Sequence, residues 1–265
     1  MNTKRFIFAL VAGLALSGAA QAVLVDNGGG LIYDSTNNIT WLQDANLAAS
    51  DNMGVTGVHA DGSVDSWFTA IDYIAAMNAA NYLGHSDWRL PTMQDNGAAG
   101  CQGVVVNGTD DCGYNATYST STQTNSQTSG EMANLYYKEM NGVPSCSATG
   151  PSDCSTQQSS SFFPGPFMHV QTGNTAAYWY GTTYAPNSNG AWIFDFTGGG
   201  QIFAPKQDSV SNPPPPSQSV KGYFFWPVLA GNVTPAAVPE PEAWLLMLAG
   251  LGMVGTAVAR RRQRG

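Results

Sequence analysis

The chain has 265 residues, a formal net charge of −8, and only 11% charged residues. Ordinary soluble domains carry about 25%. Because 43% of the residues are hydrophobic, the low charge does not indicate disorder, which requires low hydrophobicity as well. The negative charge argues against nucleic acid as a partner, since phosphates are bound by basic surfaces. The length suits one large domain or two small ones.

Residues 1–22 have the pattern of a secretory signal peptide. Lys4 and Arg5 precede an apolar run over residues 6–16, and small residues follow at the positions that signal peptidase reads. The run is short for a membrane span, which needs about 20 residues. We therefore predict export by the Sec machinery and cleavage between Ala22 and Val23. A retained membrane anchor is the alternative.

Residues 23–231 form the predicted body, in which strands predominate. The short apolar segments that predict strands are residues 31–33, 39–42, 178–180, 192–196, 201–203 and 223–226. The turn composition of residues 34–38 predicts a hairpin between the first two segments. Three glycines, Gly198 to Gly200, predict a second hairpin. In the strand before them, apolar residues alternate with the outward-facing Asp195.

Two helices are predicted in the body. Asp65 or Ser66 can cap the first, which Gly84 ends and whose apolar positions are Trp67, Ile71, Ile74, Ala75 and Tyr82. Thr128 and Glu131 have capping-box spacing ahead of the second, which ends at Gly142 and whose apolar stripe is Met132, Leu135, Tyr136 and Met140. Two helices among short strands predict an α+β domain. Residues 205–220, with their four consecutive prolines, are expected to form an extended surface loop.

The residues from 239 onward have three parts. Pro239-Glu240-Pro241 is followed by a sixteen-residue apolar run, Trp244 to Ala259, and then by an arginine-rich tail. As a helix this run would be about 24 Å long, somewhat short of a hydrocarbon core of about 30 Å. The arginines predict that their flank stays cytoplasmic. A simple tail anchor fits this pattern as well.

The order of these three parts over residues 239–265 resembles the PEP-CTERM sorting signal, with residues 232–238 as a linker. The resemblance implies a Gram-negative bacterium that makes exopolysaccharide. It also implies that an exosortase in the inner membrane recognises the motif and helix and removes them. The helix would anchor the chain transiently before its release to the cell surface or extracellular matrix.

The body carries a second resemblance. The segment Asp87-Trp88-Arg89-Leu90-Pro91-Thr92, together with the strand segments around it, resembles the Lcl C-terminal domain family. This resemblance implies one C-type-lectin-like domain over residues 23–231, with short antiparallel strands, two helices and long loops. It also implies attachment to sulfated polysaccharides, and hence a place in biofilm. The chain departs from the family pattern at Tyr180, where serine is usual, and at Trp226, where arginine is usual.

Four cysteines lie in two close pairs, with ten and seven residues between partners. An exported chain meets an oxidising compartment, where disulfides are the default. We expect Cys101–Cys112 and Cys146–Cys154, although four cysteines allow three connectivities. Zinc is the alternative, but Cys-x-x-Cys spacing is absent from the sequence.

The sequence contains none of the common catalytic motifs. Its histidines, His59, His85 and His169, are widely separated, and it has no nucleophile elbow or phosphate-binding loop. We therefore expect no enzymatic activity and no cofactor. Calcium at Asp110 and Asp111 is an open possibility, although a solvated acidic loop is the simpler interpretation.

Three side chains are candidate ligand contacts. Arg89 could hold an anionic sugar, but an arginine between Trp88 and Leu90 more often forms a structural ion pair, here with Asp87 or with an acid distant in sequence. Trp179 and Tyr184 could stack on sugar rings, but aromatic residues in strands are mostly part of the core.

We consider two functions. The first is an exported, non-catalytic surface or matrix protein that binds carbohydrate or another matrix component. The second is a secreted enzyme that acts on exopolysaccharide through a pair of carboxylates. Residues 23–238 contain four cations and sixteen acids, a net charge of −12. This charge disfavours a sulfated polymer and favours a neutral glycan, a calcium-bridged glycan or a structural role.

Overall fold

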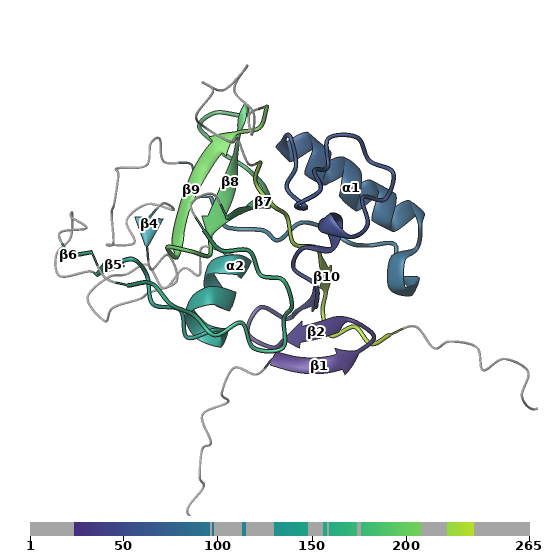
Figure 1. The fold of residues 1–265 in the computed structure, drawn as a ribbon, viewed down its shortest axis with the longest axis horizontal. Coiled ribbons are helices and arrows are strands. Elements are labelled where there is room, and N and C mark those ends of the chain that lie inside the picture. The colour runs from purple at the N-terminus through teal and green to yellow at the C-terminus, as the bar shows by residue number, and fades with distance from the viewer. Residues whose placement is uncertain are drawn as a thin grey trace, which may run out of the picture.

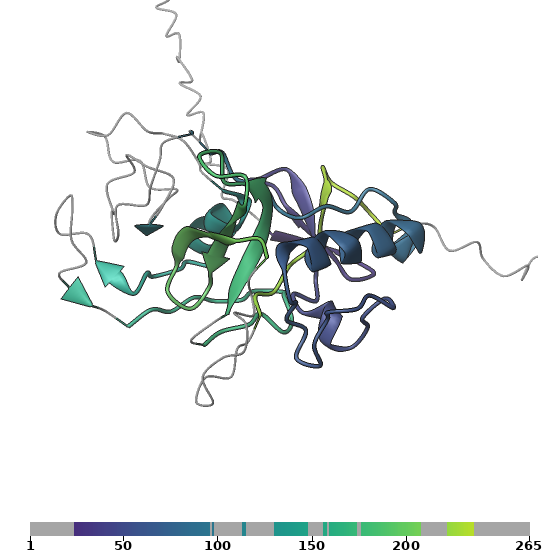
Figure 2. The same ribbon diagram turned by 90° about the horizontal axis from the view of Figure 1, so that it is seen from above.

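The structure is a computed structural model that describes residues 24–95, 97, 113–114, 130–147, 156–157, 159–173, 176–207 and 222–235. Two four-stranded antiparallel sheets and two α-helices form an α+β body, as predicted (Figure 1). Seen from above, helix α1 and the second sheet lie on opposite sides of the molecule (Figure 2). Within these ranges, the helices are too short or too polar to cross a bilayer.

The first sheet has the strand order β1-β2-β3-β10. Its strands are β1 (Leu24–Gly28), β2 (Leu31–Asp34), β3 (Ile39–Leu42) and β10 (Val228–Ala230). The predicted hairpin is confirmed by the pairing of β2 with β3. The fully buried Asp34 closes its turn, because its carboxylate accepts the N–H groups of Thr36 and Asn37, both at 3.0 Å, and the indole N–H of Trp41 at 3.1 Å.

The second sheet has the strand order β4-β9-β8-β7. Its strands are β4 (Gly113–Tyr114), β7 (Ala177–Thr183), β8 (Gly190–Asp195) and β9 (Gly200–Pro205). The predicted hairpin is confirmed by the pairing of β8 with β9. Both faces of β8 are covered, since Ile193 and Phe194 are only 4% and 0% exposed. The strands β5 (Cys146–Ser147) and β6 (Thr156–Gln157) form a separate two-stranded antiparallel sheet.

The strand predicted over residues 223–226 is wrong in position. Tyr223 and Phe224 form only isolated bridges, and regular pairing begins at Val228. Pro227 lies between Phe224 and Val228 and has no backbone N–H to donate to a strand pairing. The apolar residues before it are instead packed into the core.

Helix α1 (Trp67–Ala79) begins as predicted, because the Ser66 hydroxyl accepts the N–H of Thr69 at 3.1 Å. It ends five residues before Gly84, and a 3₁₀ turn, η2 (Tyr82–Gly84), follows Asn81 in the left-handed region. The predicted apolar face is partly wrong, since Ile74 is buried as expected but Ile71 is 36% exposed and Ala75 is exposed as well. The buried side chains are Thr69, Ala70, Tyr73, Ile74 and Met77. A short 3₁₀ turn, η1 (Leu47–Ala49), lies between β3 and α1.

The second helix, α2 (Glu131–Asn134), continues into a π-helical turn, η3 (Leu135–Glu139). The predicted capping box is wrong, because Gly130 is the N-cap and makes no side-chain cap. Thr128 lies outside the described residues. The predicted apolar stripe is confirmed, since its members are all fully buried: Met132, Leu135, Tyr136 and Met140.

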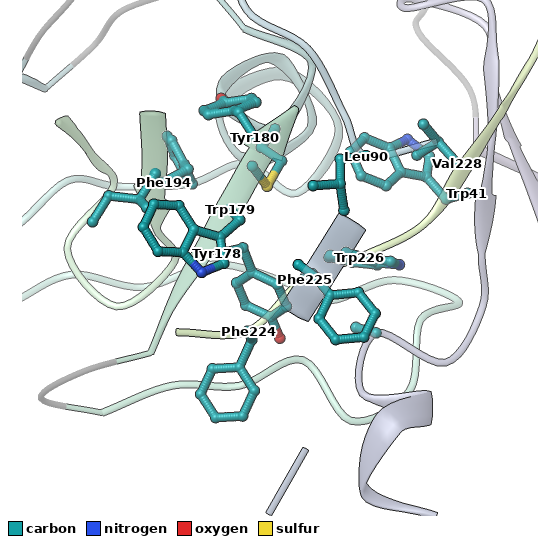
Figure 3. Packing of buried hydrophobic residues seen from close by; sticks show 14 of the residues in the cluster. Trp41, Leu90, Tyr178, Trp179, Tyr180, Phe194, Phe224, Phe225, Trp226 and Val228 are labelled. Carbon is teal, nitrogen blue, oxygen red and sulfur yellow. The ribbon is translucent and has the colours of Figure 1, made fainter. Parts of the chain in front are cut away.

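Aromatic rings join the two sheets into one core (Figure 3). Trp226 is fully buried and its ring centroid lies 5.1 Å from that of Trp41 in the first sheet and 5.8 Å from that of Tyr178 in the second. Its indole N–H donates to the Leu42 carbonyl at 2.7 Å. One side chain therefore links both sheets by packing and by a hydrogen bond.

Candidate functional site

A segment outside the helices and strands of the two main sheets, residues 159–173, carries the candidate site. Its start is tied to the chain after η3, because Val143 and Ser161 exchange backbone hydrogen bonds of 2.7 and 3.2 Å. Its second half is tied to the chain after β3, where the Met168 N–H donates to the Gln43 carbonyl at 2.9 Å. These bonds hold the segment in place and so position its side chains.

A groove of about 510 Å³ opens along this segment. Its apolar lining consists of Phe162, Pro164, Phe167 and Val170, and its hydroxyl groups come from Ser160, Ser161, Thr172 and Thr197. Phe167 is anchored edge-on against Trp226, with the ring centroids 4.8 Å apart. Volumes of about 300–1,000 Å³ are typical of small-molecule sites. The groove is therefore large enough for a ligand of that size.

A second groove, of about 380 Å³, shares Ser160 and Thr197 with the first, so the two adjoin. Asp195 lines it at the end of β8 and accepts the N–H groups of Thr197 at 2.7 Å and Gly198 at 3.1 Å. Burial raises the pKa of the Asp195 carboxyl above its usual 3.8, and these hydrogen bonds offset part of that rise. The second groove therefore contains a fixed hydrogen-bond acceptor.

His169 stands in the lining of the first groove in a strained conformation. Its φ of 56° lies in the left-handed region, which costs a non-glycine residue about 1–2 kcal/mol. Its Nδ1 lies 3.0 Å from a carboxylate oxygen of Asp44, and its side chain is 65% exposed. Strained residues of this kind concentrate at functional sites. An accessible imidazole, paired with Asp44, therefore belongs to a residue of the groove lining.

The lining favours a neutral ligand that is rich in hydroxyl groups. Serine and threonine hydroxyls both donate and accept hydrogen bonds, and aromatic rings provide apolar faces. Among the described lining residues of the two grooves there is no lysine or arginine to pair with a sulfate or phosphate. The described ranges also hold no group of three metal-ligating side chains. Asp110 and Asp111, the candidate calcium ligands, lie outside them.

Comparison with known families assigns most of the chain. The Lcl C-terminal domain matches residues 30–212, and the PEP-CTERM protein-sorting motif matches residues 237–263. The chain belongs to the Lcl C-terminal domain family. The sorting motif makes this family member an exported surface protein, with an exosortase as its sorting partner and a membrane-anchored C-terminal signal. No curated protein and no solved structure matches the chain.

The Lcl-family segment around Arg89 is a structural joint outside both grooves. The Arg89 guanidinium makes a two-pronged ion pair with Glu131, with bonds of 2.8 and 2.7 Å. Glu131 also accepts the N–H of Thr92 at 2.6 Å. The partner is therefore an acid distant in sequence rather than Asp87. This joint fastens the segment that follows α1 to the start of α2.

The structure places the two candidate aromatic contacts in the core. Trp179 lies among the core side chains (Figure 3) and is 0% exposed. It meets Tyr223 edge-on, with ring centroids 5.0 Å apart. Tyr184 is 4% exposed and stacks on Phe203 at 3.8 Å. Neither ring can stack on a sugar in this conformation, because protein atoms already cover both. The interpretation of these rings as ligand contacts is corrected to a packing role.

The residues of the two grooves were missed by the sequence analysis. The segment 159–173 has neither the 3.6-residue nor the 2-residue apolar period by which elements are recognised. The only available signal was two consecutive phenylalanines, Phe162 and Phe163, between serines and a proline. Exposed aromatic residues in such a setting are candidates for ligand contact.

Several predicted sites lie outside the described residues. These are the signal cleavage site at Ala22 and Val23, the sorting motif Pro239, Glu240 and Pro241, and three of the four cysteines, Cys101, Cys112 and Cys154. Cys146 begins β5. The two disulfides stay predictions.

Proposed function

We propose that this domain is a non-catalytic, C-type-lectin-like module that binds a neutral polysaccharide at the cell surface, in its two adjoining grooves. One observation carries the proposal: the described lining combines hydroxyl groups, phenylalanine rings and one half-buried carboxylate, and it includes no lysine or arginine. The lectin-like assignment rests on the family, and the short antiparallel strands and long connections support it.

The hydrogen bonds that the aspartates make within turns support a neutral ligand. Seven aspartates accept the backbone N–H two residues further on and so close turns: Asp26, Asp34, Asp44, Asp51, Asp61, Asp95 and Asp195. Aspartate closes such turns by this local hydrogen bond. Much of the negative charge is therefore explained by the fold and requires no cationic ligand.

Two of the three lysines and arginines in the described ranges are also engaged, and the third, the exposed Lys138, lines neither groove. Arg89 pairs with Glu131, and the Lys206 ammonium lies 4.3 Å from the centre of the Trp67 ring and donates to the Thr183 hydroxyl at 2.7 Å. A sulfated polymer would meet a surface of net negative charge at which these two cations already have partners. A neutral glycan would meet no such repulsion.

A glycan array on the mature chain, residues 23–238, tests this proposal. We expect binding to neutral polysaccharides, and we expect Thr172→Trp, which places a bulky ring in the first groove, to weaken it by about tenfold or more. Thr56→Trp, at another exposed threonine, is the matched control and should bind as the unaltered chain does. Binding confined to sulfated glycans, or equal binding by both variants, would contradict the proposal.

The same samples test the enzymatic alternative. Glycoside hydrolysis commonly uses two carboxylates about 5–10 Å apart across a cleft. Incubation with each bound polysaccharide, followed by size analysis of the polymer, should show no shortening. Release of shorter chains would replace the binding function with catalysis.

A further inference from the structure

The chain that leaves β10 stays fixed to the first sheet as far as Pro235. The Gly231 N–H donates to the Asn38 carbonyl at 2.9 Å, and the Val233 N–H donates to the Thr40 hydroxyl at 3.0 Å. The Asn27 amide donates to the Val233 carbonyl at 2.7 Å. Figure 1 shows this end of the described chain, in yellow, beside β1 and β2. The folded domain therefore reaches to within a few residues of the sorting motif.

The Pro235 ring packs on the turn between β1 and β2. A Cβ atom at Gly29 would lie 2.7 Å from this ring, so the contact leaves no room for a side chain at Gly29. Gly29 also has a φ of 61°, which glycine adopts without strain. The turn and the 231–235 segment consequently form one surface.

Only residues 236–238 separate Pro235 from the motif that begins at Pro239. A fully extended chain spans at most about 3.6 Å per residue, so Pro239 lies within about 14 Å of Pro235. The apolar run begins at Trp244, which by the same measure lies within about 32 Å. The limit on the distance of the motif from Pro235 is thus less than half of the limit for the start of the apolar run.

An enzyme that encloses a motif held within about 14 Å of a folded domain also meets the surface of that domain. We propose that residues 24–30 and 231–235, here called the terminal face, dock on the exosortase while it holds the motif. This inference rests on the sorting motif and is independent of glycan binding.

The chemistry of the terminal face suits a protein partner at close range. It is rich in small residues, and its described residues include no lysine or arginine. Its one charged group, Asp26, accepts the N–H of Gly28 at 2.8 Å. Val25 is 42% exposed and offers an apolar contact. The motif follows the terminal face more closely along the chain than Trp244 does, so the enzyme that holds the motif is the partner inferred for this face.

Processing of the full chain in the bacterium that encodes it tests the proposal. The variant Val25→Glu/Thr234→Glu places two charges on exposed positions of the terminal face. We expect removal of the tail to slow by about fivefold or more in a pulse-chase experiment, because the charges would be desolvated at the interface. The matched control is Val143→Glu/Thr56→Glu, at an exposed valine and threonine elsewhere. It should be processed at the normal rate.

A flexible insertion identifies the partner as the enzyme. About twelve Gly/Ser residues after Ala236 would let the exosortase hold the motif without touching the domain. The insertion should return the terminal-face variant to about the normal rate. A thermal melt of each purified mature chain checks that the fold is intact.

Three outcomes of the processing experiments would overturn the proposal. They are an unchanged rate in the terminal-face variant, a slowed rate that the insertion does not restore, and a full chain that is not processed at all. A fourth concerns lipid: binding of the unaltered mature chain to phosphatidylethanolamine–phosphatidylglycerol vesicles, lost in the terminal-face variant, would replace the enzyme with the membrane surface as the partner.

Discussion

The two four-stranded sheets differ in how their strands are connected. In the first sheet, two residues join β1 to β2 and four join β2 to β3. In the second, the connection from β4 to β7 runs over residues 115–176 and includes α2 and the segment that lines the grooves. Short turns closed by aspartates fix β1, β2 and β3 of the first sheet, whereas the long connection from β4 to β7 supplies side chains that a ligand can reach. One sheet therefore anchors the chain on its way to the sorting signal, and the other positions the candidate site.

Removing the ring that joins the sheets should have the largest effect. Trp226→Ala deletes packing against Trp41, Phe167 and Tyr178 and should lower the free energy of unfolding by about 3–5 kcal/mol. Urea denaturation of the mature chain measures this loss. Phe163→Ala, at a 68% exposed side chain, is the control and should cost about 0.5 kcal/mol or less. Equal losses in the two variants would show that the sheets do not share one core.

Breaking the ion pair between Arg89 and Glu131 should have the next largest effect. Arg89→Ala leaves the Glu131 carboxylate, 16% exposed, without its charged partner and should cost about 2 kcal/mol. The melting temperature should fall while glycan binding by the folded chain is retained, because this joint lies outside the grooves. Arg89→Lys should recover part of the loss. Lost binding with an unchanged melt would place Arg89 in the site instead.

Relieving the strained residue of the site should separate stability from binding. His169→Gly removes the left-handed strain and should raise the free energy of unfolding by about 1 kcal/mol or less, since a weak exposed pair with Asp44 is lost as well. Glycan affinity should fall. Asn38→Gly, at a φ of 50° in the turn of the first sheet, is the comparison, and it should gain less because the short asparagine side chain can hydrogen-bond locally in this region. A gain in stability with unchanged affinity would remove His169 from the site.

The smallest expected effect is a change in pH dependence at Asp195. Burial raises the pKa of this carboxyl in the folded chain, so between pH 3.8 and the raised value the folded state binds more protons than the unfolded state. Its contribution to stability therefore falls as the pH rises through that window. Asp195→Asn should remove this component from denaturation curves recorded across acidic pH. A component of the opposite sign would show that hydrogen bonds outweigh burial.

Local features of the fold could be predicted from the sequence. The two hairpins follow from turn residues that lie between short apolar segments, and the start of α1 follows from the Ser66 cap. The buried face of α1 could not be predicted as reliably, because several sets of its apolar residues fit a helical period. The packing of Tyr73 against Phe225 decides between them, and that contact spans more than half of the chain.

The site depends on contacts that a single sequence does not encode locally. Thr40 pairs with Leu229 and Arg89 with Glu131, and nothing around either partner identifies the other. Trp179 and Tyr184 are aromatic residues of the kind on which sugar rings stack, yet neighbouring rings cover them. The groove segment is positioned by backbone hydrogen bonds, which carry no side-chain pattern. Its members could be recognised only after the fold was known.

The position of β10 has a consequence for the order of folding. This strand, the last of the described chain, pairs with β3, and the residues just before it place Trp226 between the two sheets. During synthesis and secretion the earlier strands emerge first, but the first sheet lacks a member until residues 222–235 have crossed the membrane. Pairings this distant in sequence also form slowly. The first sheet and the packing of Trp226 can therefore be completed only after residues 222–235 have been exported, shortly before the sorting motif follows.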